Sequence, residues 1–498
     1  MKTKNTKLKE VKQFFSDEIP KIPPHWKLVP LEEVCYKIEN GGTPSTSVRE
    51  NYDESGIPFI RGENVLQNGE VVLLKKQIRI SKTAHENQSN SIIHPKDVLM
   101  NLVGPPLGKI GLVPDEIVEA NINQGLVLMR TVPSYDPKLL WYCLRSPFYY
   151  NYILKMARGD RQLYIRESNV GKIPIPIIPP NEQKRLVYKL DQLFSINNSV
   201  KQALKSIPPL IKKLQRSILM PAFRGNLVEN EKNSTPELLE KIRKKRQIDD
   251  QKWNISDDDL GESDYYAQLC PIPKTWTYVK LKDVIHEAQS GFACGKRDEN
   301  GYVQLRMNNI GLQGKLVLDK ILKVPKSETN LEKFKLKNND ILFNNTNSAE
   351  LVGKTAIFRG EIENCVFSNH ITRIRVDESL TIPEWATLLL LWQQQLGIFE
   401  RSCRRFVGQA GLERDRILLI EYPLPPLQEQ KFIVSKIEEL VSSSHRVQQS
   451  VEFALQASNE IQRSILTKAF AGELVSKDPK DESSPVFAEK IRTEKESI

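Results

Sequence analysis

Two long stretches of the chain share one spacing of apolar residues. Between 182 and 223 the apolar side chains, with Asn197 included, recur at alternating steps of four and three residues. That is the heptad rhythm of a long helix with one narrow apolar seam. The same rhythm returns 247 residues later, with Ser444 in the slot of Asn197. The seam positions are Leu186, Leu190, Leu193, Val200, Leu204, Ile207, Ile211, Leu214 and Ile218 in the first stretch, and Ile433, Ile437, Leu440, Val447, Val451, Ile461 and Ile465 in the second.

The two stretches are copies of each other. The segment EQK at 182–184 returns at 429–431, and QRSIL at 215–219 returns at 462–466. An isolated helix would expose its seam to water, so we expect the copies to pair, antiparallel if an internal two-fold axis relates them. The alternative is that each seam packs on its own globular domain. The prolines at 208 and 209 predict an interruption and a kink in the first helix.

The duplication extends to the segments around the helices. Strand-rich stretches at 57–60 and 302–305 occupy matching places, as do predicted helices around 137–156 and 382–402. A proline-rich segment then predicts an extended connector into each long helix. After each long helix, Ser or Thr before Pro marks the start of a short helix.

These patterns predict an α+β protein, internally duplicated, with two globular α/β domains separated by a long antiparallel two-helix coiled coil. The predicted segments are a basic flexible N-terminal arm (1–21), the first globular domain (22–180), the first long helix (181–223), a linker with a short helix (224–270), the second globular domain (271–427), the second long helix (428–470) and a C-terminal tail with a short helix (471–498).

Composition and charge narrow the class of function. The 498 residues carry a formal net charge of +10, which favours a polyanionic partner such as nucleic acid. No run of about 18 apolar residues predicts a membrane span, and the lysine-rich start lacks the apolar core of a signal peptide, so we expect a cytoplasmic protein. The six cysteines form no CxxC and the six histidines no HxxxH, which argues against a metal site or a disulfide framework.

A search for catalytic motifs finds none. An adenine methyltransferase is expected to carry Asn/Asp-Pro-Pro-aromatic to hold the flipped base, and the chain has no such motif. The segment GPPLGK at 104–109 loosely resembles a phosphate-binding loop, but its spacing is wrong and no Ser or Thr follows the lysine. We therefore assign no catalytic and no metal-binding residue.

The duplicated order of motifs resembles the specificity subunit of type I restriction–modification systems. The matching features are Pro-x-x-Trp followed by Leu-x-x-Val (31–34 and 281–284), the loop GGTP at 41–44, the hinge in which Pro-Pro precedes Glu-Gln (PPNEQ at 179–183 and PPLQEQ at 425–430), and the run from QRSIL to Ala-Phe-x-Gly-x-Leu that ends each long helix. Together they span almost the whole chain. The second copy departs at the loop, where SGF at 290–292 stands in place of GGTP.

The resemblance implies a bipartite double-stranded DNA target, with one half-site read by each target-recognition domain. It also implies two modification subunits that carry S-adenosylmethionine, and restriction subunits that bring ATP and Mg in the larger complex. It implies no catalysis and no cofactor in this chain.

Base reading needs Arg, Lys, Asn and Gln at base edges, and phosphates need Lys, Arg and hydroxyls. Arg61 and Arg306 recur in both copies, which favours scaffold or phosphate contacts over base discrimination. The DNA-binding candidates are Thr43, Ser45, Arg61, Asn64, Lys109, Arg158, Arg161, Gln162 and Tyr164 in the first domain, and Lys296, Arg297, Arg306, Asn308, Arg401, Arg404, Arg405 and Gln409 in the second.

A helix of about 35 residues is about 50 Å long. Because one turn of duplex is about 34–36 Å, we expect the helices to hold the two domains roughly one to two turns apart on DNA. Two other classes of function stay open from the sequence: a single-chain restriction or methylation enzyme, and a scaffold protein that binds no DNA.

Overall fold

The computed structural model describes residues 22–104, 106–159, 163–227, 240–242, 244, 270–312 and 314–498. The expected N-terminal arm and most of the linker between the two halves lie outside these residues, as does the side chain of Ile218. The chain divides into two compact units, Met1–Lys205 with Val451–Ile498, and Ser206–Ser450.

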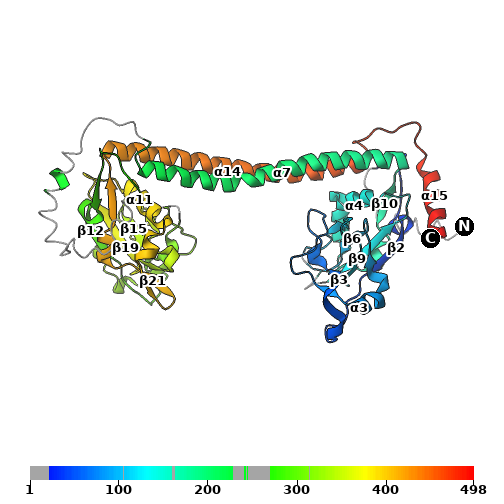
Figure 1. Ribbon diagram of the computed structural model, residues 1–498, viewed down its shortest axis with the longest axis horizontal. Coiled ribbons are helices and arrows are strands. Elements are labelled where there is room, and N and C mark those ends of the chain that lie inside the picture. Colours follow the sequence, from blue (N-terminus) through cyan, green and yellow to red (C-terminus); the bar gives the residue numbers. More distant parts are fainter. Residues whose placement is uncertain are drawn as a thin grey trace. The chain divides into compact units, whose positions relative to one another are not determined.

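The first unit is built on two four-stranded sheets, ordered β2-β9-β6-β7 and β4-β3-β8-β5, and a two-stranded pair β1-β10 (Figure 1). Its main core joins β6 and β9 to α4, α5 and the start of α7. Its elements are β1 (Lys27–Pro30), α2 (Leu31–Val34), β2 (Cys35–Asn40), β3 (Tyr52–Ile60), β4 (Arg79–Ile80), α3 (Lys82–Asn87), β5 (Ile92–Ile93), β6 (Val98–Asn101), β7 (Ile110–Leu112), β8 (Ala120–Ile122), β9 (Leu126–Thr131), α4 (Pro137–Arg145), α5 (Pro147–Lys155), α6 (Glu167–Val170), β10 (Pro174–Ile177), the start of α7 (Pro180–Phe223), the end of α14 (Leu427–Phe470) and α15 (Ser484–Ser497).

The second unit keeps one four-stranded sheet and the two-stranded pair, but has two three-stranded sheets in place of the second four-stranded sheet. Its sheets are β12-β19-β15-β17, β14-β13-β18 and β16-β21-β20, with the pair β11-β22. Its elements, besides the end of α7 and the start of α14, are β11 (Thr277–Lys280), β12 (Ile285–Ser290), β13 (Tyr302–Leu305), β14 (Leu322–Val324), α10 (Leu331–Phe334), β15 (Ile341–Asn344), β16 (Thr346–Asn347), β17 (Thr355–Ile357), β18 (Val366–Phe367), β19 (Ile371–Val376), α11 (Pro383–Gln395), α12 (Ile398–Ser402), β20 (Arg404–Phe406), β21 (Gln409–Gly411), α13 (Arg414–Leu418) and β22 (Glu421–Leu424).

The predicted strands at 57–60 and 302–305 are confirmed as parts of β3 and β13. The predicted single helices around 137–156 and 382–402 are wrong, because each is two helices. Ser146, with ψ of 151°, precedes Pro147 and ends α4, since the residue before proline disfavours helix. Gly397 adopts φ of 73°, a left-handed conformation that separates α11 from α12.

The proline-rich connector of each copy is a strand. β10 pairs antiparallel with β1, the strand that follows the Pro-x-x-Trp motif, and β22 pairs antiparallel with β11. Prolines are tolerated in such two-stranded pairs because their missing N–H groups can face away from the partner. The chain therefore leaves each globular domain beside the point where it entered.

A glutamate and the glutamine after it, in the first turn of each long helix, hydrogen-bond the helix to its domain. The indole Nε1 of Trp26 donates to Glu182 in the first turn of α7 at 3.0 Å, and Trp276 donates to Glu429 in α14 at 2.7 Å. The next residue is a glutamine in both helices. The side chain of Gln183 accepts from the backbone N–H of Asp136 before α4, and Gln430 accepts in the same way before α11. The Pro-x-x-Trp and Glu-Gln motifs therefore both contribute to the junction between each domain and its long helix.

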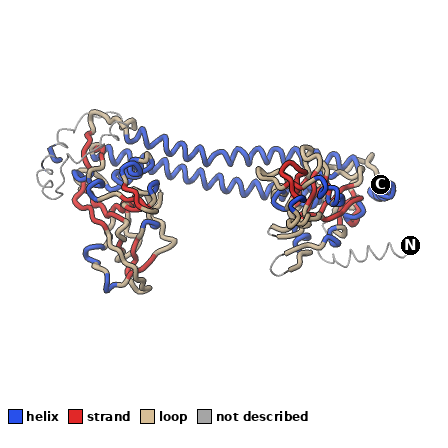
Figure 2. Tube along the Cα trace, turned by 60° about the horizontal axis from the view of Figure 1, so that its bottom comes forward, coloured by secondary structure: helices blue, strands red, loops and turns tan. Residues whose placement is uncertain are grey.

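The long helices run antiparallel in each unit, as the sequence predicts. In the first unit the start of α7 (Leu186, Leu190) shares a core with the end of α14 (Leu466, Phe470). In the second unit the end of α7 is buried with the start of α14. Within each unit the two helices lie side by side in both views (Figure 1, Figure 2). α7 continues as one helix through Pro208 and Pro209, so the expected interruption is wrong.

The apolar seam is only partly buried. Leu186, Leu190, Ile433 and Ile437 are buried in the domain cores, whereas five seam residues further along the helices are 37–52% exposed. Pairing with the other helix and packing on the domain therefore both occur, at different positions of the same seam. The exposed seam residues are Val200, Leu214, Leu440, Val447 and Ile461, the half-buried ones are Leu193, Leu204, Ile207, Ile211 and Ile465, and Val451 is buried.

The polar slot of the seam is filled differently in the two units. Asn197 is buried and donates to the backbone oxygen of Ser458 on α14 at 3.2 Å, while the Ser458 hydroxyl donates back at 2.7 Å. Ser444, the counterpart of Asn197, instead donates to the backbone of its own helix at Leu440. A buried polar pair of this kind fixes the register of two helices.

The C-terminal helix α15 packs on the first domain. Phe487 and Ile491 are buried in the core of that domain, and Arg492 donates to Glu33 at 2.9 Å. The predicted helix start is confirmed, with Ser483 as N-cap and proline in the first turn. Its counterpart around 234–236 lies outside the described residues.

Candidate nucleic-acid interface

A turn that follows the central strand of each domain is held by a buried asparagine. Asn64 accepts from the backbone N–H of Arg61 at 2.8 Å, and its Nδ2 donates to the backbone oxygen of Val72 at 2.8 Å. Asn309 makes the same two bonds, with Arg306 and Val317. Because Asn64 is 1% exposed, its amide is used inside the fold, and its prediction as a DNA contact is wrong.

A lysine supports the same turn. The Nζ of Lys109 donates to the backbone oxygen of Gly62, and Lys354, its counterpart, donates to Met307 at 3.2 Å and Ile310 at 2.8 Å. Burial lowers the pKa of both lysines. Lys109 is half-buried and supports the turn, and a DNA contact by its side chain stays a prediction.

In both domains, the loop that follows the first strand of the four-stranded sheet (β2 or β12) passes very close to the backbone of another segment. A Cβ added at Gly41 would lie 2.1 Å from the oxygen of Ile122, and one at Gly291 would lie 2.3 Å from the oxygen of Phe367. Only glycine fits such an approach. The second copy thus keeps the glycine that the loop requires although its other residues differ from GGTP.

These loops carry exposed polar candidates. Thr43 accepts from the backbone N–H of Gln124 at a long 3.4 Å, and the Ser45 hydroxyl is hydrogen-bonded to the Ser47 hydroxyl at 2.7 Å. In the second domain Lys296 forms an ion pair with Glu328, and Arg297 donates to backbone oxygens of its own loop. All four predicted side chains are exposed.

Each domain carries a short antiparallel pairing among its exposed described residues. In the second domain β20 and β21 form it, and β16 pairs with β21. In the first, Arg158 and Tyr164 exchange backbone bonds at 2.8 and 2.9 Å, and Val103 bridges to Tyr164. Figure 1 places β21 at the end of the second domain remote from the long helices.

The second hairpin combines arginines with apolar residues. Arg404 pairs with Glu413 at 2.6 Å and Arg405 with Glu400 at 3.8 Å, with all four side chains largely exposed. Phe406 is 62% exposed and Val407 fully exposed. A hollow of about 650 Å³ beside the hairpin is lined by Gln395, Leu396, Gly397, Glu400, Arg401, Cys403 and Arg405.

The other predicted DNA-binding residues differ in how exposed their side chains are. Arg61 and Arg306 are half-buried, and Arg161 and Gln162 lie outside the described residues. The sequence interpretation missed Phe406 and Val407, although the order Arg-Arg-Phe-Val-Gly was a usable signal. The exposed candidates are Thr43, Ser45, Arg158, Tyr164, Lys296, Arg297, Asn308, Arg401, Arg404, Arg405 and Gln409.

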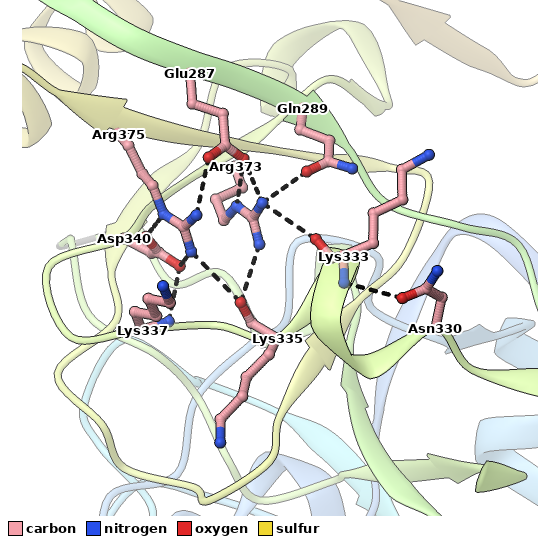
Figure 3. Close-up of polar contacts among 9 residues, drawn as sticks. All are labelled: Glu287, Gln289, Asn330, Lys333, Lys335, Lys337, Asp340, Arg373 and Arg375. Carbon is pink, nitrogen blue, oxygen red and sulfur yellow. Dashed lines mark hydrogen bonds and ion pairs between the residues drawn. The ribbon is translucent and has the colours of Figure 1, made fainter.

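Charged groups behind this surface are internally paired. A bidentate pair joins Arg375 to Asp340 at 2.6 and 3.0 Å, and Arg130 and Asp97 form its counterpart in the first domain. The second domain adds Glu287, which accepts from both Arg373 and Arg375 (Figure 3).

These pairs set the charge state of Glu287. Burial tends to raise the pKa of Glu287, but Arg373 and Arg375 outweigh it and hold that pKa below its usual value. Arg373 also donates to Gln289 at 2.6 Å and to the backbone oxygen of Lys335 at 2.9 Å. We therefore assign this cluster to the scaffold, since its charges serve one another.

The described residues contain no helix that is both long and apolar enough to cross a membrane. A family model described as the type I restriction modification DNA specificity domain matches residues 23–208 and 273–452. The chain is similar to the type I restriction enzyme StySPI specificity subunit of Salmonella potsdam, at 25% identity over 92% of this chain and 90% of that protein. It is 23% identical to the EcoKI specificity subunit of Escherichia coli, over 95% and 96%.

Two solved structures have the same fold. The HsdS subunit from Thermoanaerobacter tengcongensis gives a TM-score of 0.53 at 18% identity, covering 91% of this chain and 98% of that chain. A chain from a structure on complex assembly and conformational transition of the type I R-M system gives 0.58 at 18% identity, covering 91% and 99%.

Proposed function

Because the chain belongs to the family of type I restriction–modification DNA specificity domains, we propose that it is the DNA-recognition subunit of a type I restriction–modification complex. Each domain reads one half of a bipartite double-stranded DNA target. The chain itself catalyses nothing. S-adenosylmethionine is bound by two modification subunits, and ATP and Mg by restriction subunits, in a cytoplasmic complex.

The observation that carries this proposal is the duplicated scaffold with unlike surfaces. Both domains hold the same turn with a buried Asn and a supporting Lys, and both carry an antiparallel pairing of exposed residues, Arg158 with Tyr164 in the first domain and β20 with β21 in the second. Among the described residues, the exposed side chains of these two segments differ. Two recognition domains that share a scaffold but carry different surface residues suit a target whose two halves differ in sequence.

The long helices supply the spacer and the docking surface for modification subunits. Their seam leaves Val200, Leu214, Val447 and Ile461 about half exposed, which suits further helices packing along them. Inserting one heptad at facing positions of α7 and α14 adds about 10 Å, or about three base pairs of duplex. We expect the undefined centre of the target to lengthen accordingly. A target of unchanged spacing would contradict the spacer role.

The test of the function is co-expression with the modification subunit encoded beside this chain, followed by mapping of methylated adenines by long-read sequencing. The expected result is one split motif with two defined halves and an undefined centre. A stable complex that adds no methylation would contradict the proposal and favour a scaffold protein. Methylation or cleavage of DNA by the purified chain alone would favour a single-chain enzyme.

A further inference from the structure

The hairpin β20–β21 ends in an apolar tip that the described residues of the second domain leave largely exposed. Val407 and Gly408 form its turn, and Gly408 adopts φ of 77°, which permits the tight reversal. Phe406 and Val407 are 62% and 105% exposed. Two adjacent large apolar side chains at a projecting tip favour a binding partner that removes them from water.

The charges around the tip point to a polyanion. Residues 398–416 contain five arginines and three acidic residues. Exposed ion pairs such as Arg404–Glu413 and Arg405–Glu400 contribute little stability, so these arginines can exchange a carboxylate for a phosphate at small cost. A partner protein with an apolar patch would not need this arginine excess.

The geometry of the hairpin fits the major groove. A two-stranded ribbon enters this groove, which is about 12 Å wide. Along β20 the side chains alternate, so Arg404 and Phe406 share one face and Arg405 lies on the other. With the tip at the floor of the groove, arginines on both faces lie toward the phosphates of its walls. The apolar group that DNA presents at that floor is the C5-methyl of thymine.

We propose that Phe406 and Val407 are specificity-determining residues that contact thymine methyl groups in the half-site of the second domain, with Arg404 and Arg405 on the flanking phosphates. This assignment rests on the proposed function of the chain in DNA recognition. Beyond that function, it identifies the chemical group of the DNA that is recognised, a methyl group, and the groove in which the contact is made.

The test uses the full chain in complex with its modification subunit and a duplex that carries the methylated motif. Each thymine of the motif is replaced in turn by deoxyuridine, which removes only the methyl group. Removing one buried methyl is expected to weaken binding about fourfold. V407S and F406S are each tested on the same set of duplexes. V118S is the matched control, because Val118 is a 72% exposed valine that belongs to the first domain, not to the hairpin.

In a double-mutant cycle, we expect the methyl groups of one or two thymines to be energetically coupled to the hairpin tip. Deoxyuridine there weakens the wild-type complex about fourfold and has no further effect on the V407S or F406S complex. V118S behaves as wild type. The double variant R404Q/R405Q lowers the slope of log K against log salt by about two, whereas V407S leaves that slope unchanged.

Two outcomes would overturn the assignment. One is that deoxyuridine costs the same in wild type and in both tip variants, or costs nothing anywhere. The other is that V407S weakens association with the modification subunit and leaves the target unaltered, which would make the tip a protein contact. A wild-type complex without any methylated motif would instead defeat the proposed function, so the two failures are distinguishable.

Discussion

Replacing Asn309 by alanine tests whether the turn after β13 is held by its side chain. Asn309 accepts from Arg306 N–H at 2.9 Å and donates to Val317 and Lys320 oxygens, both at 2.9 Å. It is 4% exposed, so water does not replace these bonds in the native state. At about 1 kcal/mol for each of three bonds, N309A should cost about 3 kcal/mol. N308A, at the exposed neighbouring residue, should cost less than about 0.5 kcal/mol.

Hydrogen–deuterium exchange read by mass spectrometry measures this loss locally. In N309A the peptides of 302–324 should exchange about a hundredfold faster, because 3 kcal/mol corresponds to about two decades in the opening equilibrium. Peptides of 57–80 in the first domain serve as the internal control and should not change. Protection of 302–324 that matches wild type would refute the structural role of Asn309. It would also reopen Asn64 as a DNA contact.

Three further changes probe other parts of the fold. W276F removes the indole donor to Glu429 and should lower the free energy of unfolding by about 1.5–3 kcal/mol, seen as an earlier urea midpoint; an unchanged midpoint would contradict the role of this bond in the junction. P208A/P209A should raise the melting temperature, since each proline costs a helix interior about 3 kcal/mol; a lower temperature would show that the prolines fit a need of the fold. Glu287 has a lowered folded pKa, so its contribution is complete above its unfolded pKa of about 4.3 and is lost as pH falls below it. E287Q should therefore lose less stability than wild type between about pH 5 and pH 3, and an identical loss would exclude Glu287 as a source of acid sensitivity.

Regular elements were the most predictable part of the fold. The heptad spacing predicted both long helices, since a seam of period 3.5 has no other stable solution over 40 residues. The helix breaks were harder to place. Ser146-Pro147 is a local signal that the longer helical pattern masked, and Gly397 ends α11 through a left-handed backbone conformation that no periodicity reveals.

The site was predicted less well because residue type does not reveal burial. Asn64 and Lys109 have the chemistry of DNA contacts, but Asn64 is buried, and the half-buried Lys109 donates to the backbone of the same turn. Their recurrence in the second copy, as Asn309 and Lys354, was the signal for a scaffold role, since two readers of different sequences should share only their framework. A search confined to polar residues also passed over the exposed tip of the second hairpin.

Independent reading of the two half-sites is the claim that a domain exchange tests most directly. Residues 271–427 are replaced by the corresponding domain of another family member, and methylated adenines are mapped after co-expression with the modification subunit. The expected motif keeps one half and the spacing of the wild-type target and acquires a new second half. A motif changed in both halves, or unchanged in both, would contradict the reading of one half-site by each domain.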